Sequence, residues 1–107
     1  MTYKQGDLVL VNYPFSNMTD FKIRPALVIS NNDFNYATDL WICPITSKEA
    51  KNSLYLNDSI IEGHFDNNSF VKTGTIATFE NEVIIKKIGR ISTSKLAEVV
   101  SVVKKNL

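Results

Sequence analysis

Two polar side chains beside apolar runs are the residues of this chain best suited to chemistry. Arg24 stands directly before Pro25 in FKIRPALVIS, and Thr46 closes the run LWICPIT. Because proline favours an extended conformation in the residue before it, a strand predicted to begin at Pro25 fixes where the Arg24 side chain departs. A guanidinium and a hydroxyl on rigid strand ends suit a phosphate group. On spacing alone, a surface arginine with its stem along apolar neighbours is the commoner interpretation.

The single histidine, His64, offers a second kind of chemistry. It lies in the polar stretch EGHFDNN, where an imidazole can act as a general base, although a solvated loop residue is the simpler interpretation. The sequence has no Gly-rich phosphate-binding motif, no HExxH and no paired Cys or His spacing. We therefore expect no metal, no other cofactor and no Ser-His-Asp triad.

Length and charge limit the class of protein. The 107 residues, 44% of them hydrophobic, are enough for one core, and we expect one domain over residues 1–107. Twelve Lys and Arg residues against eleven Asp and Glu give a net charge of +1. Such a chain has no overall basic field to attract nucleic acid, so a polyanion must be held by a local site.

The only cysteine and the first residues indicate the cellular compartment. Cys43 has no partner for an internal disulfide and is flanked by apolar residues, as a small buried hydrophobe would be. The opening MTYKQGDLVLV has an apolar run too short for a signal peptide or a membrane span. We expect a cytoplasmic protein with no membrane partner.

Short runs rich in β-branched and aromatic residues, separated by Asn, Asp and Ser, predict strands joined by turns. The runs are residues 7–13, 25–30, 39–46, 53–57, 70–79 and 83–91. Six closely spaced strands favour a small barrel or sandwich.

The last residues change to a helical period. Apolar residues at steps of three and four predict an amphipathic helix, with the hydroxyls of residues 92–94 at its N-cap and two lysines near its C-terminus. The apolar positions are Leu96, Val99, Val100, Val103 and Leu107. The sheet must then have an apolar outer face to receive this helix.

Several of these segments, in this order, resemble one known family. GDLVLVNYPF at 6–15, RPALVIS at 24–30 and ICPITS at 42–47 are similar to the MazF/PemK family of toxin endoribonucleases from bacterial toxin–antitoxin pairs. Residues 68–92 and the closing helix are similar to the later part of that family. Family members often carry a glycine and a glutamate in the loop before the arginine, whereas residues 16–23 read SNMTDFKI.

The resemblance implies a mainly β fold with one helix, a small SH3-like barrel of the CcdB/PemK type with a C-terminal amphipathic helix. It also implies a homodimer, a cognate antitoxin and metal-independent, sequence-specific cleavage of single-stranded RNA. The family's catalytic arginine falls on Arg24 and its catalytic threonine on Thr46. The 2′-OH would attack the adjacent phosphorus, leaving a 2′,3′-cyclic phosphate and a 5′-OH end.

Neighbouring residues are candidates for RNA binding. Lysines beside the two catalytic candidates can contact adjacent phosphates, and aromatic residues can stack on an unpaired base. The candidates are Phe15, Phe21, Lys22, Ser47 and Lys48. Solvated lysines and aromatic residues at the edge of the core are equally good interpretations.

Three other functions remain open at this level. A toxin of related fold could poison a topoisomerase by binding through its C-terminal helix, with Arg24 and Thr46 dispensable. A regulatory module could bind a partner without activity, or the barrel could simply bind RNA, which the near-neutral charge disfavours. The presence of both Arg24 and Thr46 favours the enzyme.

Overall fold

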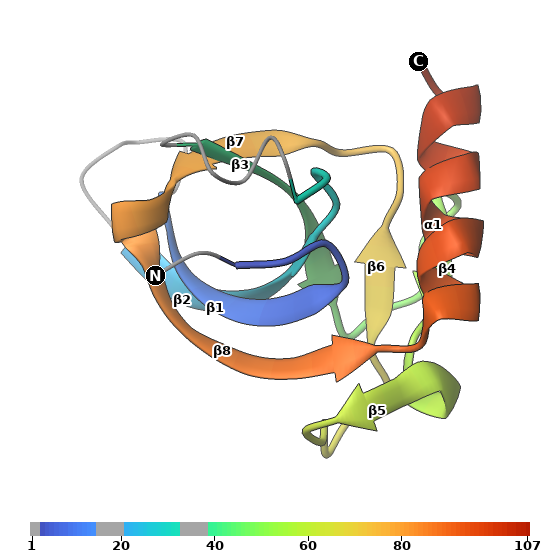
Figure 1. The fold of residues 1–107 in the computed structure, drawn as a ribbon. Helices are drawn as coiled ribbons and strands as arrows, with labels where there is room; N and C mark the ends of the chain where they lie inside the picture. Colours follow the sequence, from blue (N-terminus) through green and yellow to red (C-terminus); the bar gives the residue numbers. More distant parts are fainter. Residues whose placement is uncertain (1–2, 15–20, 33–38) are drawn as a thin grey trace.

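The computed structural model describes residues 3–14, 21–32 and 39–107. One curled antiparallel sheet forms a half-barrel, and the helix α1 (Thr93–Lys105) stands against its outer side (Figure 1). The strands are β1 (Asp7–Pro14), β2 (Phe21–Val28), β3 (Asp39–Thr46), β4 (Ser53–Tyr55), β5 (Ile60–Glu62), β6 (Phe70–Lys72), β7 (Ala77–Glu80) and β8 (Ile84–Ile91). Two short 3-10 helices, η2 (Asn57–Ser59) and η3 (Asn81–Val83), precede β5 and β8. The mainly β fold with a C-terminal helix is confirmed.

The strands follow the order β4-β6-β3-β2-β1-β8-β5, and β7 also pairs with β3. β3 therefore pairs with both β6 and β7, in addition to β2. Its first half pairs with β7 from Asp39 to Ile42, and its last two residues pair with β6. Because β3 changes partner along its length, the sheet curls around it instead of remaining flat (Figure 1).

The central strands β1, β2 and β3 are buried on both faces. One apolar cluster contains Leu8, Leu27 and Cys43 together with Val99 and Val103 of α1. The alternate residues of the same strands face the inside of the curl, where the second cluster lies. That second cluster is formed by Tyr3, Val9, Val11, Ala26, Val28, Leu40, Ile42 and Ile84. The expected apolar outer face for the helix is therefore present.

Helix α1 begins and ends as its sequence predicts. The Ser92 hydroxyl accepts a hydrogen bond from the backbone N–H of Lys95 at 3.2 Å and so caps the first turn. Lys104 and Lys105 lie in the last turn, at the negative end of the helix dipole. Among the described residues, no helix is long and apolar enough to cross a membrane.

Three strand boundaries differ from the expectation. β2 begins at Phe21, so Arg24 lies within the strand, and Pro25 lies just beyond the last β2–β3 pair, where its missing N–H costs no bond to β3. The run 70–79 is interrupted by a turn and forms β6 and β7. β5 was not predicted, because its three residues follow η2 in a segment that reads as a turn.

Cys43 is fully buried between the sheet and α1. Burial raises the pKa of its thiol from 9.0 to about 12, because the thiolate would lose its hydration there. The side chain therefore packs as a neutral hydrophobe, as the sequence predicts.

We predict that Cys43 is protected from thiol reagents in the folded protein. Raising the pKa from 9.0 to about 12 lowers the thiolate fraction at pH 8 roughly a thousandfold, in addition to steric protection. Because the folded pKa lies above the unfolded one, this group's contribution to stability is complete below pH 9 and is lost as the pH rises toward 12. Alkylation rates with and without denaturant measure the protection, and equal rates would contradict it.

Candidate functional site

A cavity of about 340 Å³ opens where β2 and β3 separate. Three segments line it: the middle of β2, the end of β3 with the residue after it, and the loop between β5 and β6. The lining residues are Arg24, Pro25, Ile45, Thr46, Ser47, His64, Phe65, Asp66, Asn67 and Ser69. The two side chains proposed from sequence for phosphate chemistry, Arg24 and Thr46, thus border one cavity.

The register of β2 on β3 explains why these two residues meet. The pairs run from Val28–Ile42 to Ala26–Pro44, and continuing by two residues sets Arg24 opposite Thr46. The ladder stops before that point, although β3 continues to pair with β6 and β2 with β1 on their other edges. The strands part there, and the space between them becomes the cavity.

The Arg24 guanidinium is open to an incoming anion. Its side chain is exposed, and no described residue forms an ion pair with it. Arg90 on β8 is the opposite case, since its Nη1 lies 2.7 Å from Oδ1 of the buried Asp7. Among the described residues, Arg90 is held in an ion pair and Arg24 is not.

Thr46 presents a hydroxyl in a defined orientation. Its Oγ1 accepts a hydrogen bond from the backbone N–H of Lys48 at 3.3 Å. A hydroxyl that accepts one hydrogen bond can still donate its own hydrogen, here to an atom held in the cavity. Arg24 and Thr46 can therefore both donate hydrogen bonds to one bound group, which suits an anion such as phosphate.

The loop 63–69 closes the third side and is held in place at three points. Asn57 donates through Nδ2 to the carbonyl oxygens of Asn67 at 2.9 Å and Phe65 at 3.5 Å. Its Oδ1 accepts from the backbone N–H of Ser69 at 2.6 Å. The Phe65 side chain packs on the core, and Gly63, at φ +85°, lies so close to β8 that a Cβ would collide with its backbone.

This loop brings the histidine to the cavity. The sequence interpretation of His64 as a solvated residue agrees with its side chain, which is 81% exposed, yet the same residue lines the cavity. Its Nε2 lies 3.2 Å from Oδ1 of Asp66. Sequence reasoning did not select Asp66, Asn67 or Ser69, and the only signal was the polar composition of the loop itself.

The candidate RNA-binding residues fall into three groups. Ser47 lines the cavity, whereas Lys22 and Lys48 are exposed and lie outside its lining. Phe15 and the side chain of Phe21 lie outside what the structure describes. Within the described ranges, no group of three or more His, Cys, Asp or Glu residues is placed to hold a metal ion.

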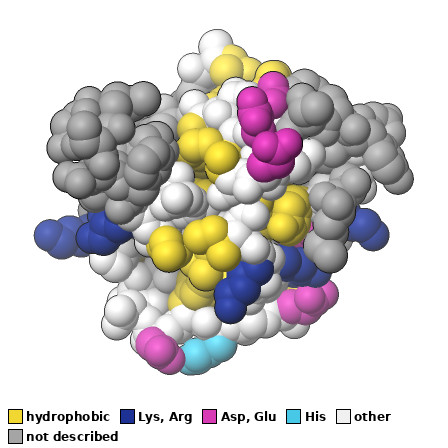
Figure 2. All heavy atoms as spheres, turned by 90° about the vertical axis from the view of Figure 1, so that its left-hand side faces the viewer, with side chains coloured by type: hydrophobic (Ala, Val, Ile, Leu, Met, Phe, Trp, Pro, Cys, Tyr) yellow, Lys and Arg dark blue, Asp and Glu magenta, His cyan; other side chains and the backbone are white. Residues whose placement is uncertain are grey.

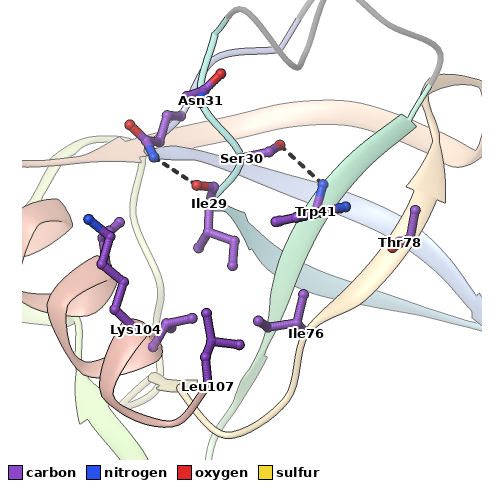
Figure 3. A pocket seen from close by; sticks show the side chains of 11 residues that line it. Ile29, Ser30, Asn31, Trp41, Ile76, Thr78, Lys104 and Leu107 are labelled. Carbon is purple, nitrogen blue, oxygen red and sulfur yellow. Dashed lines mark hydrogen bonds between the residues drawn. The ribbon is translucent and has the colours of Figure 1, made fainter.

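A larger cavity of about 810 Å³ has a different character (Figure 3). It lies between β3, β7 and the end of α1, and among the described residues that line it Lys104 is the one with a charged side chain. Three large side chains on its wall, Trp41, Ile76 and Leu107, are exposed. Despite its size it brings together no set of groups for proton or phosphate chemistry, so the smaller cavity is the candidate active site.

The side of the half-barrel away from α1 bears hydrophobic, basic and acidic side chains in alternation (Figure 2). Ile23 of β2 and Ile85 of β8 are among the exposed hydrophobic residues of the chain. Among the described residues, the basic side chains on this face form separate patches, in keeping with the net charge of +1. Binding of a polyanion would therefore depend on local contacts such as those of Arg24.

The sequence matches, over residues 4–107, the family described as PemK-like, MazF-like toxin of type II toxin–antitoxin system. No curated protein sequence matches this chain.

Solved structures show the same fold at low sequence identity. MazF from Deinococcus radiodurans superposes with a TM-score of 0.76 at 21% identity, covering 98% of this chain and 96% of that one. An endoribonuclease in complex with its cognate antitoxin from a mycobacterial species gives 0.73 at 12% identity, covering 97% and 93%. A MazE–MazF complex from Deinococcus radiodurans gives 0.71 at 21%, covering 98% and 94%. The barrel type expected from the sequence is confirmed.

We predict that Asn57→Ala destabilises the protein by about 1–3 kcal/mol, because it removes three hydrogen bonds to the loop backbone, among them the bond from the N–H of the buried Ser69. Asn68→Ala is the matched control, since the only hydrogen bond described for that exposed side chain is a 3.4 Å contact from Tyr55. It should change stability by less than about 0.5 kcal/mol. Urea unfolding of both variants measures the difference, and equal midpoints would show that Asn57 does not hold the loop.

Proposed function

The chain belongs to the family of PemK-like, MazF-like toxins of type II toxin–antitoxin systems, and on that premise we propose that it is an endoribonuclease. Its substrate is single-stranded RNA, and cleavage needs no metal ion. The observation that supports this most directly is the cavity shared by Arg24 and Thr46, which presents an exposed guanidinium and a hydroxyl to one bound group. Two structural neighbours are endoribonucleases from mycobacterial species, which supports the same activity.

The reaction proceeds through the RNA itself. The ribose 2′-oxygen attacks the adjacent phosphorus in line, the bond from phosphorus to O5′ breaks, and the products are a 2′,3′-cyclic phosphate and a 5′-OH end. Negative charge builds on the phosphoryl oxygens during this step. A site that offers donors to those oxygens in the transition state lowers the barrier.

Arg24 and Thr46 have distinct roles in this scheme. The guanidinium takes two phosphoryl oxygens in its planar fork, and the threonine hydroxyl donates to a third. Arginine stays protonated in proteins, so Arg24 stabilises charge and is not the group that removes the 2′-OH proton. Ser47 adds a further hydroxyl at the same wall.

Two protein partners complete the proposal. A toxin of this kind is restrained by a cognate antitoxin, and a solved neighbour is a MazE–MazF complex. A disordered acidic segment of such an antitoxin would offer carboxylates to Arg24 and apolar anchors to the larger groove beside Trp41 (Figure 3). We further propose a homodimer in a cytoplasmic setting. A topoisomerase poison or an inactive binding module would leave the Arg24–Thr46 cavity without a use.

Replacement of either catalytic candidate tests the assignment. We expect Arg24→Ala and Thr46→Ala each to slow RNA cleavage about a hundredfold to a thousandfold, the usual cost of losing one transition-state donor. Arg24→Lys should fail as well, because an ammonium does not reproduce the two-oxygen fork. Single-turnover cleavage of a long RNA in EDTA is the measurement.

Arg90→Ala is the matched control, because it removes an arginine that holds Asp7 instead of lining the cavity. It should lower the melting temperature and keep the chemistry of the remaining folded protein, whereas the Arg24 and Thr46 variants should melt as the parent does. Parent-like cleavage by Arg24→Ala or Thr46→Ala would remove that residue from its role.

A single deoxyribose at the 5′ side of the cut tests the nucleophile. The substituted oligonucleotide keeps every phosphate and base, so we expect it to bind almost as well as the all-RNA strand. It should not be cut, because the attacking oxygen is missing. Cleavage of this strand, or products with a 3′-OH and a 5′-phosphate, would instead indicate an activated water as the nucleophile.

A further inference from the structure

The reaction leaves one proton unaccounted for. The 2′-OH must lose it as the bond to phosphorus forms, and neither Arg24 nor Thr46 is suited to accept it. Among the described residues that line the cavity, three have ionisable side chains, namely Arg24, His64 and Asp66. We propose that His64 is the general base that takes this proton. The inference rests on the proposed function, because it assigns a further catalytic residue to the same site.

The pairing with Asp66 determines which nitrogen of the neutral imidazole ring can accept a proton. If Nε2 donates its hydrogen to Oδ1 of Asp66, at 3.2 Å, the lone pair of the neutral ring lies on Nδ1. That nitrogen can then accept the 2′-OH proton, and the imidazolium formed is stabilised by the carboxylate beside it. Asp66 is a positioning residue in this arrangement, since it acts through the ring.

The high exposure of His64 fits this role because its loop is fixed. The backbone on both sides of Asp66 is held by Asn57, and Gly63 packs directly against β8. The exposed side chain is therefore carried on a fixed backbone beside the cavity, where bound RNA would cover it. A base that must reach a ribose needs such an accessible position before the substrate binds.

The charges around the ring come from three elements. Asp66 of the same loop carries the carboxylate nearest to it, and Arg24 of β2 lies across the cavity. Glu62, at the end of β5, pairs with Lys87 of β8 at 3.2 Å. Bound phosphate adds negative charge that offsets Arg24.

The proton balance closes without a further protein group. The proton passes from O2′ to Nδ1 of His64, the O2′–phosphorus bond forms and the phosphorus–O5′ bond breaks. The leaving O5′ takes a proton from water, and the imidazolium returns its own to solvent before the next turnover.

Single-turnover cleavage by His64→Gln and His64→Ala tests the proposal. Both variants should cut about a hundredfold to ten-thousandfold more slowly than the parent, the usual contribution of a positioned base. Their affinity for the deoxy-substituted oligonucleotide and their product ends should not change. In the parent, the rate should rise with pH across the range from 5 to 8 in which histidines change charge, and His64→Gln should lack that rise.

Added imidazole separates a base from a structural residue. It should restore part of the activity of His64→Ala and none of the activity of Arg24→Ala. Asp66→Asn should lose less activity than His64→Gln and keep a pH-dependent rate. If His64→Gln cuts RNA as fast as the parent and with the same pH profile, while Arg24→Ala is inactive, then His64 is not the base. The proposed function would still stand. A parent protein that cuts no RNA would overturn the proposed function and this role together.

Discussion

Burial of β1, β2 and β3 on both faces is the constraint on which the rest of the structure depends. Apolar residues on the inner face of these strands fill the inside of the half-barrel. The alternate residues, such as Leu27 and Cys43, form the outer apolar face against which α1 packs. A sheet buried on one side would alternate apolar and polar residues, whereas these strands read as nearly continuous apolar runs. Polar chemistry can then occur only where those runs end.

The candidate site lies at such an end. β2 and β3 pair as far as Ala26 and Pro44 and then separate, each kept extended by a different neighbouring strand. Arg24 and Thr46 lie two residues past the last pair, so the core fixes their backbones while their polar ends reach the cavity. Beneath them, the loop fixed by Asn57 adds the histidine and the carboxylate.

Local sequence patterns predicted what depends on local chemistry. Residue types and spacing predict the apolar strands, the capped helix and the position of the arginine beside Pro25. The loop 63–69 was not predictable, because its position depends on Asn57 and on contact between Gly63 and the backbone of β8, more than twenty residues further along the chain. β5 was missed for the same reason, since so short a strand is defined by its partner and not by its own composition.

The pairing of β1 with β8 bears on how the chain is made. The first strand leaves the ribosome early but gains its second neighbour only after residues 84–91 have been synthesised. The loop that carries His64 depends on the same late strand, because Gly63 is seated on it. Contacts so distant in sequence form slowly and cannot form in a partial chain. The cavity is thus completed only after β8 has been synthesised, and a product truncated before β8 would have neither the closed sheet nor the assembled site.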